Sequence, residues 1–344
     1  MSESVTELII ILSKIGFVLG ILLTGVAYSV YAERRVSAFI QNRHGPNRVG
    51  PQGLLQPLVD AVKLLMKEDI VPEKANKFIH SLAPAISIIV SLSTFAVIPF
   101  GDTITIGENV IKLQIADVNI GILYFLAMTS LGVYGVTLSG WSSNNKYSLL
   151  GGLRSSAQMI SYELSMGLAV IAIILMNGSL ELDTIVGSQA GWKWNILLQP
   201  VGFIIFLVSA FAETNRTPFD LPEAEQELVG GYHTEYSSMK FALFFLAEYA
   251  NVIISSSMIV TLYLGGWQFP YLQDMGLPAM LVSILQVLTF ATKVILMVLF
   301  FIWVRWTIPR FRYDQLMNLG WKVMLPLGIA NLIITAIVVL LMKS

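Results

Sequence analysis

The sequence contains no cysteine and few charged residues, and each shortage excludes a class of protein. Of its 344 residues, 55% are hydrophobic and only 12% are charged. Without cysteine, the chain cannot hold a disulfide, a thiolate zinc site or a cysteine-ligated iron–sulfur cluster. Its histidines, His44, His80 and His233, lie far apart without paired-ligand spacing, so no metal site is expected. Such an apolar composition is typical of a membrane protein.

Eight stretches are apolar and long enough to cross a bilayer, which takes about 20 residues for a hydrocarbon core of roughly 30 Å. The first stretch lacks a basic leader region and a cleavage site, so we expect a retained helix. We predict an all-α, polytopic membrane protein with about eight transmembrane helices in a single integral membrane domain, residues 1–344. The stretches are 8–32, 78–100, 118–140, 157–176, 196–211, 241–264, 281–304 and 323–342.

The positions of lysine and arginine predict the orientation. Sixteen of the 21 lie in the segments that follow odd-numbered spans. By the positive-inside rule these segments face the cytosol, and both termini are expected on the periplasmic side. The cytosolic segments, about 33–77, 141–156, 213–240 and 305–322, are long and polar, so we expect function on this side.

A segment too short to span the membrane, 54–67, has strong helical amphipathicity. Its apolar residues fall on one face and its polar residues on the other, with Pro57 tolerated in the first turn. We predict a short amphipathic helix at the membrane interface. A helix packed on a partner subunit would show the same periodicity.

Several ionisable residues lie within or at the ends of the spans, where insertion costs at least about 2.5 to 3.5 kcal/mol. Glu163 and Glu248 lie roughly 10 Å below the cytosolic boundary, at 1.5 Å per residue. Glu33 and Glu213 close their spans, and Lys293 lies near a midplane. Neighbouring carboxylates in such surroundings cannot all ionise at once, and a coupled cluster is suited to passing protons.

Simpler explanations cover part of this pattern. Lys14 is near a helix end and can extend to the interface. Glu33 could belong to an ordinary helix-end cluster with Arg34 and Arg35. In the acidic segment 213–235, Asp220 could cap a helix and Glu223 could complement its dipole. These local roles leave the remaining excess of carboxylates unexplained, and that excess suggests a field acting on protons or on a charged partner.

Long motifs give the chain a resemblance to a known family. It resembles the H subunit of bacterial NADH:quinone oxidoreductase (respiratory complex I), the counterpart of mitochondrial NADH dehydrogenase subunit 1. The resemblance covers essentially the whole chain. The segments that carry it are 32–35 (AERR), 43–51 (RHGPNRVGP), 53–63 (GLLQPLVDAVK), 140–147 (GWSSNNKY), 161–163 (SYE), 213–227 and 309–317 (PRFRYDQLM).

The resemblance implies a subunit without a redox centre of its own. Quinone is the substrate at a shared site, while FMN and iron–sulfur clusters belong to partner subunits. The expected partners are the other complex I subunits, including two hydrophilic quinone-site subunits and adjacent small membrane subunits, together with the lipid bilayer and no nucleic acid. The expected location is the bacterial cytoplasmic (inner) membrane.

The resemblance also assigns residues to two roles, with no catalytic residue or metal ligand among them. Some family members have an additional carboxylate in the third span, where this chain has Ser130. The residues matching the quinone chamber are Arg34, Asp60, Glu213, Arg216 and Arg310. The residues matching a proton path are Glu33, Glu163, Glu223, Glu225, Glu227, Glu248 and Lys293.

Two other functions stay open at this stage. The same architecture serves relatives whose electron donor is ferredoxin or a hydrogenase partner, and this chain alone does not identify the donor. The buried charges would also suit a proton-coupled transporter that acts by itself. The lack of an obvious inverted repeat weakens that alternative. The lack of a P-loop or G-x-G-x-x-G motif leaves nucleotide binding without support.

Overall fold

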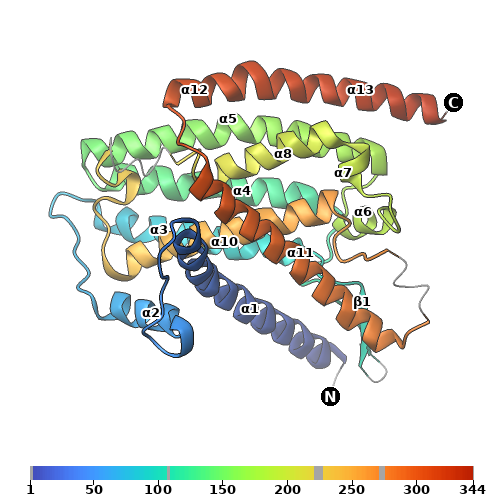
Figure 1. The fold of residues 1–344 in the computed structure, drawn as a ribbon, viewed down its shortest axis with the longest axis horizontal. Coiled ribbons are helices and arrows are strands. Elements are labelled where there is room, and N and C mark those ends of the chain that lie inside the picture. Colours follow the sequence, from blue (N-terminus) through green and yellow to red (C-terminus); the bar gives the residue numbers. More distant parts are fainter. Residues whose placement is uncertain (1–2, 107–108, 221–227, 271–275, 344) are drawn as a thin grey trace.

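The chain forms a bundle of long helices joined by shorter segments (Figure 1). The structure, a computed structural model, describes residues 3–106, 109–220, 228–270 and 276–343. Within these residues, seven helical segments are long and apolar enough to cross a membrane, which confirms the predicted all-α, polytopic fold. They are built on α1 (Glu3–Ile40), α3 (Lys77–Thr94), α4 (Gly121–Ser142), α5 (Lys146–Asn177), α10 (Ser238–Tyr263), α11 (Ala279–Thr307) and α13 (Leu325–Lys343).

The remaining predicted span, 196–211, is interrupted. A single turn, α7 (Asn195–Leu198), precedes α8 (Pro200–Glu213), and Pro200 occupies the first turn of α8. Proline has no backbone N–H to donate, so it suits a helix start and ends the preceding turn. With 14 residues, α8 is apolar but shorter than the seven long helices.

The segments predicted to face the cytosol are partly helical, because the helices extend past the apolar stretches. Helix α1 continues to Ile40 and α11 to Thr307. Helix α5 already begins at Lys146, where the Asn145 side chain accepts a hydrogen bond from the Tyr147 backbone N–H. The expected loop 141–156 is therefore mostly helix, because an N-cap can start a helix ahead of the apolar stretch.

The predicted amphipathic helix is present as α2 (Gln56–Met66), following a short 3-10 turn, η1 (Pro51–Gly53). Pro57 lies in its first turn, as expected, and none of its residues is buried. Leu58, Leu65 and Met66 are largely exposed. The apolar face of α2 is therefore open to a bilayer or to another subunit.

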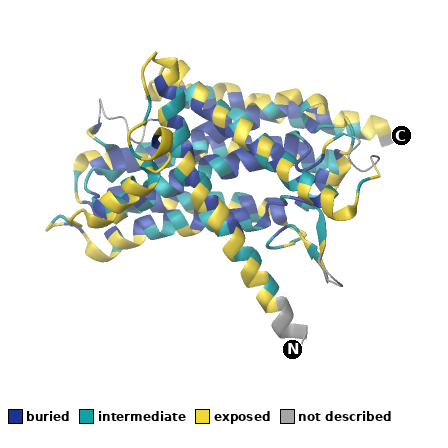
Figure 2. Ribbon diagram, turned by 60° about the horizontal axis from the view of Figure 1, so that its bottom comes forward, coloured by how far each residue is buried: buried dark blue, intermediate teal, exposed yellow. Residues whose placement is uncertain are grey.

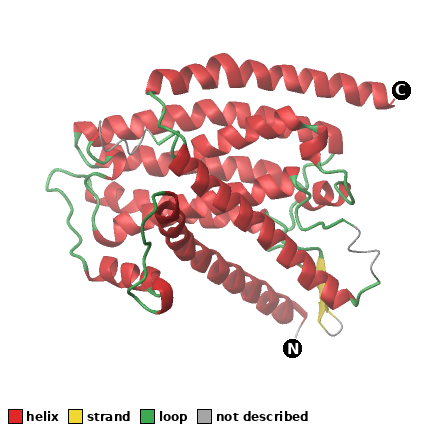
Figure 3. Ribbon diagram, in the orientation of Figure 1, coloured by secondary structure: helices red, strands yellow, loops and turns green. Residues whose placement is uncertain are grey.

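A β-hairpin, drawn in yellow in Figure 3, was not anticipated from the sequence. Strands β1 (Thr103–Ile106) and β2 (Asn109–Lys112) pair antiparallel, with Thr103 opposite Lys112. The other short elements are helical: η2 (Phe95–Val97), α6 (Leu182–Ser188), η3 (Gly231–His233), α12 (Tyr313–Asn318) and the π-helical turn η5 (Leu319–Met324), which joins α12 to α13.

Helix α10 forms the centre of the bundle and contacts α1, α3, α8 and α11. Helix α5 packs against α4 and α8 and carries α13 on its outer side. Buried residues gather inside the bundle, whereas exposed residues predominate on the outer faces of α1 and α13 (Figure 2). The centre around α10 is therefore where charged residues from different helices can meet away from the surface.

Candidate functional site

A cluster of four charged residues joins three helices to the turn after α8. Arg216 lies between two carboxylates, with Nη1 3.4 Å from Glu33 Oε2 and Nε 2.7 Å from Glu248 Oε1. Arg305 of α11 approaches Glu33 Oε1 at 2.5 Å. The Tyr249 hydroxyl donates to Glu33 Oε2 at 2.9 Å, and the Arg216 guanidinium lies 4.0 Å from the centroid of the Tyr249 ring. Two cations thus balance two carboxylates inside the bundle.

Burial makes this balance necessary. Glu33, Arg216 and Glu248 are 7%, 4% and 8% exposed. Removing one partner of a buried ion pair typically costs about 3 to 5 kcal/mol, because the other charge stays behind without solvent. The four residues therefore act as one electrostatic unit, and a charge added nearby acts on all of them.

The backbone after α8 turns sharply, and this turn places Arg216 in contact with α1 and α10. Asn215 adopts a left-handed conformation with φ of 50°, which asparagine tolerates better than most residues. The Gln158 side chain of α5 donates to the carbonyls of Ala212 and Phe219 at 2.8 Å, one on each side of the turn. Arg216 is thereby held by its backbone as well as by its ion pairs.

Two further carboxylates, Glu163 and Glu213, form an acidic pair near the same turn. The Ser130 hydroxyl of α4 hydrogen-bonds Glu163 of α5. Glu213, at the end of α8, interacts with Glu163 electrostatically and with the Thr129 hydroxyl by a hydrogen bond. Among the described residues, Glu213 Oε2 has no hydrogen-bond partner. Ser130, which stands where some family members have a carboxylate, is thus part of this pair's surroundings.

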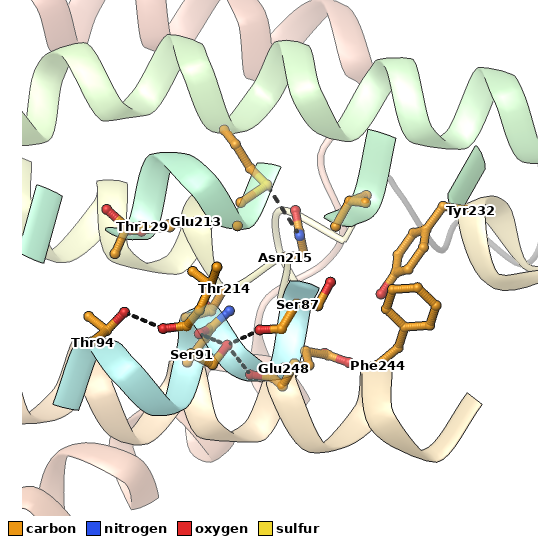
Figure 4. Close-up of a pocket in the computed structure, with 16 residues that line it drawn as sticks. Ser87, Ser91, Thr94, Thr129, Glu213, Thr214, Asn215, Tyr232, Phe244 and Glu248 are labelled. Carbon is orange, nitrogen blue, oxygen red and sulfur yellow. Dashed lines mark hydrogen bonds between the residues drawn. The ribbon is translucent and has the colours of Figure 1, made fainter. Parts of the chain in front are cut away.

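A small cavity lies between the charged cluster and the Glu163–Glu213 pair. Glu248 of the cluster and Glu213 of the pair both line it (Figure 4). Its volume is about 40 Å³, enough for roughly three water molecules at about 10 to 15 Å³ each. Hydroxyl groups of α3 form one wall, from Ser87, Ser91 and Thr94. A roomy site with several polar partners favours ordered water.

A larger cavity of about 320 Å³ lies between α2, the end of α1 and the start of α10. Arg34 and Asp60 line it and pair at 2.7 Å, and Gln56 Nε2 donates to Asp60 Oδ1 at 2.9 Å. Tyr236 also lines it, and burial raises the pKa of this phenol to about 12. Its hydroxyl therefore keeps its proton at neutral pH, and it hydrogen-bonds the Ser142 hydroxyl at 3.2 Å.

The other candidate residues lie apart from these groups. Arg310 pairs with Asp220 at 2.8 Å, outside the cluster of four. Lys293 donates to the carbonyls of Leu264, Gly266 and Gln268 at 2.7 to 3.0 Å. These carbonyls follow the end of α10 opposite to Glu248, so within the described residues Lys293 is not joined to the carboxylates. Its proposed place in a proton path stays a prediction. Glu223, Glu225 and Glu227 lie outside the described residues.

Sequence reasoning missed several residues of this site. Arg305 counted only as a cytosolic cation, and Tyr249 received no role. The hydroxyls of Ser87, Ser91 and Thr94 recur at four- and three-residue intervals, which places them on one face of α3. A polar stripe on an apolar helix is the signal that would have predicted the cavity wall.

Comparison with known proteins identifies the family. The sequence model described as NADH dehydrogenase matches residues 13–336. The chain belongs to this family. A relative from Cytophaga hutchinsonii, named as H subunit 1 of NADH-quinone oxidoreductase, is 56% identical over 91% of this chain and 92% of its own length. Subunit 8 of the Rhodothermus marinus enzyme is 56% identical over 90% of this chain and 91% of its own length. H subunit 1 from Geobacter metallireducens is 50% identical over 99% of this chain and 100% of its own length.

These matches confirm the family predicted from the motifs. They also confirm that the chain is one subunit of an enzyme complex, and the long apolar helices confirm a multi-pass membrane protein. Family membership does not assign a role to any individual residue.

Proposed function

We propose that this chain forms the membrane-side part of the quinone-binding chamber of an NADH:quinone oxidoreductase and the start of the polar path that couples quinone reduction to proton pumping. Its partners are the two hydrophilic quinone-site subunits, which with others hold FMN and iron–sulfur clusters, and the neighbouring small membrane subunits. It acts as a single membrane domain in the bacterial cytoplasmic membrane, with both termini on the periplasmic side.

The 320 Å³ cavity beside α2 supports the quinone part of the proposal. Its wall combines apolar Leu64 and Phe241 with the Arg34–Asp60 pair and the side chain of Tyr236. Lys63, Lys67, Ser237 and Ser238 also line it. The carbon stems of the lysines and the rings of Tyr236 and Phe241 supply apolar surface, and the charged ends can bind the polar end of a ligand. Quinone passing here takes up two electrons from the partner clusters and two protons to become quinol.

The proposed proton path is supported by the 40 Å³ cavity, because Glu213 and Glu248 both line it. Glu248 belongs to the charged cluster, and Glu213 interacts with Glu163. A charge change on the quinone side alters the balance among Glu33, Arg216 and Arg305. Glu248 then exchanges a proton with water in the cavity, and Glu213 takes up or releases it on the far side. From Glu213 the change continues through Glu163 toward the pumping subunits.

The hydroxyl wall of α3 gives a test with a matched control. In the assembled complex, Thr94→Val should lower proton pumping roughly fivefold, because losing one hydrogen bond to ordered water costs about 1 kcal/mol and about 1.4 kcal/mol is tenfold. Thr261→Val is the control. Both threonines are buried and bond the carbonyl four residues earlier, but only Thr94 lines the cavity. Vesicle acidification per NADH oxidised measures the effect.

Equal pumping by the two threonine variants would contradict the water path through this cavity. NADH oxidation by ferricyanide, which bypasses quinone, serves as the assembly control. It should be the same in both variants and in the unaltered complex.

A further inference from the structure

A long apolar groove on the outside of the bundle has no part in the proposed proton path. It lies between α1 and α11, which run side by side (Figure 1), and its floor is formed by α10 and by the residues around η2. Its volume is about 460 Å³, within the range of roughly 300 to 1,000 Å³ typical of ligand sites. Among the residues that line it are Phe17, Leu22, Gly25, Phe290, Ala291 and Val298.

The shape of the groove suits one extended hydrocarbon chain. Its α1 wall runs from Phe17 to Ala32 and its α11 wall from Val287 to Leu299, which at 1.5 Å per residue is about 22 Å and 18 Å. One leaflet contributes about half of the roughly 30 Å hydrocarbon core. The groove is therefore long enough to hold an acyl chain over the full depth of one leaflet, and its apolar walls exclude water.

The groove ends at the ion pair of Glu33 and Arg305. Ser29 and Val298 line both the groove and a small adjoining cavity that Glu33 and Arg305 also line. The Arg305 side chain is 23% exposed. Its guanidinium has five N–H donors, so the bond to Glu33 does not exhaust its capacity. On the same turns of α11, Trp303 and Trp306 are exposed, and exposed tryptophans typically lie at headgroup level.

We propose that this groove binds one anionic phospholipid, with an acyl chain between α1 and α11 and the phosphate beside Arg305. Basic pockets between transmembrane helices on the cytoplasmic side bind anionic headgroups in this way. The bound chain fills the space between α1 and α11, the two helices that carry Glu33 and Arg305. It thereby fixes the distance across which this ion pair forms.

Photolabelling of the assembled complex in lipid vesicles tests the proposal. Phosphatidylglycerol with a diazirine in its acyl chain should label the groove-lining segments 17–32 and 287–299. Unlabelled phosphatidylglycerol should compete for the site, and phosphatidylcholine should not. Ala291→Phe should lower labelling at least fivefold, because the ring enters the groove. Gly25→Leu, from the α1 side, should do the same.

Thr292→Phe is the matched control, since it adds the same ring at the next residue, which is exposed and does not line the groove. It should leave labelling unchanged. The proposal is overturned if phosphatidylcholine competes equally or if the two phenylalanine variants label alike. It is also overturned if only a diazirine-tailed quinone labels the groove, or if no lipid label reaches it because a partner subunit covers it.

Discussion

Replacing Arg216 with methionine is expected to lower quinone-coupled proton pumping at least a hundredfold. Arg216 lies within 3.4 Å of Glu33 and 2.7 Å of Glu248. Its loss leaves Glu248 without that cation, at a cost of about 3 to 5 kcal/mol if the carboxylate stays charged. The carboxylates will bind protons instead and hold them through the redox cycle. Pumping per NADH oxidised measures the loss.

Two further variants separate this electrostatic role from a general effect of losing an arginine. Arg216→Lys keeps the charge but not the planar fork that reaches both carboxylates. Its pumping should therefore fall between that of the unaltered complex and that of Arg216→Met. Arg312→Met removes an exposed arginine that pairs with Asp314 and should pump normally. Near-normal pumping by Arg216→Met, in complex assembled in normal amount, would refute the role given to the cluster.

The second large effect is expected from Glu248→Gln. Glutamine keeps the shape of the side chain and one acceptor oxygen, but it has no charge and cannot exchange a proton at neutral pH. We expect pumping and quinone reductase activity to fall on the order of thirtyfold, corresponding to roughly 2 kcal/mol. Glu181→Gln is the control, because it makes the same chemical change where the side chain accepts from Thr184, away from the cluster.

A double-mutant cycle links these two predictions. Because Arg216 and Glu248 are in direct contact, their effects on pumping should be far from additive, with an interaction of about 0.5 to 3 kcal/mol. Effects that simply add would mean that the two residues act separately, contrary to the proposed unit.

Much of the fold was predictable because the bilayer imposes strong local rules. Length and hydropathy located the spans, and helical periodicity located α2. The interruption before α8 was also present in the sequence, as Gln199-Pro200, but an apolar window averages over a single proline. The hairpin β1–β2 escaped because its strands have four residues each and lie outside the apolar stretches.

The site was predictable as a set of residues but not as a set of contacts. The cost of burying charge singled out Glu33, Glu163, Glu213 and Glu248. Depth along a helix does not say which helices are neighbours, so the separation of Glu33 and Glu248 from Glu213 and Glu163 required the structure. The contact between Glu33 and Arg305 joins residues 272 positions apart, and no local pattern encodes such a contact. Lys293 shows the converse, since backbone carbonyls can engage all three N–H donors of a partly buried lysine without any carboxylate.

The most direct test of the account is a redox-induced infrared difference spectrum of the assembled complex, recorded as quinone is reduced. If protons pass between Glu248 and Glu213, reduction should change a carboxylic acid C=O band that shifts in deuterated water. The band assigned to Glu213 should be absent in Glu213→Gln and lost or shifted in Glu248→Gln. A carboxyl difference spectrum identical in the unaltered complex and in both variants would contradict the proposed coupling.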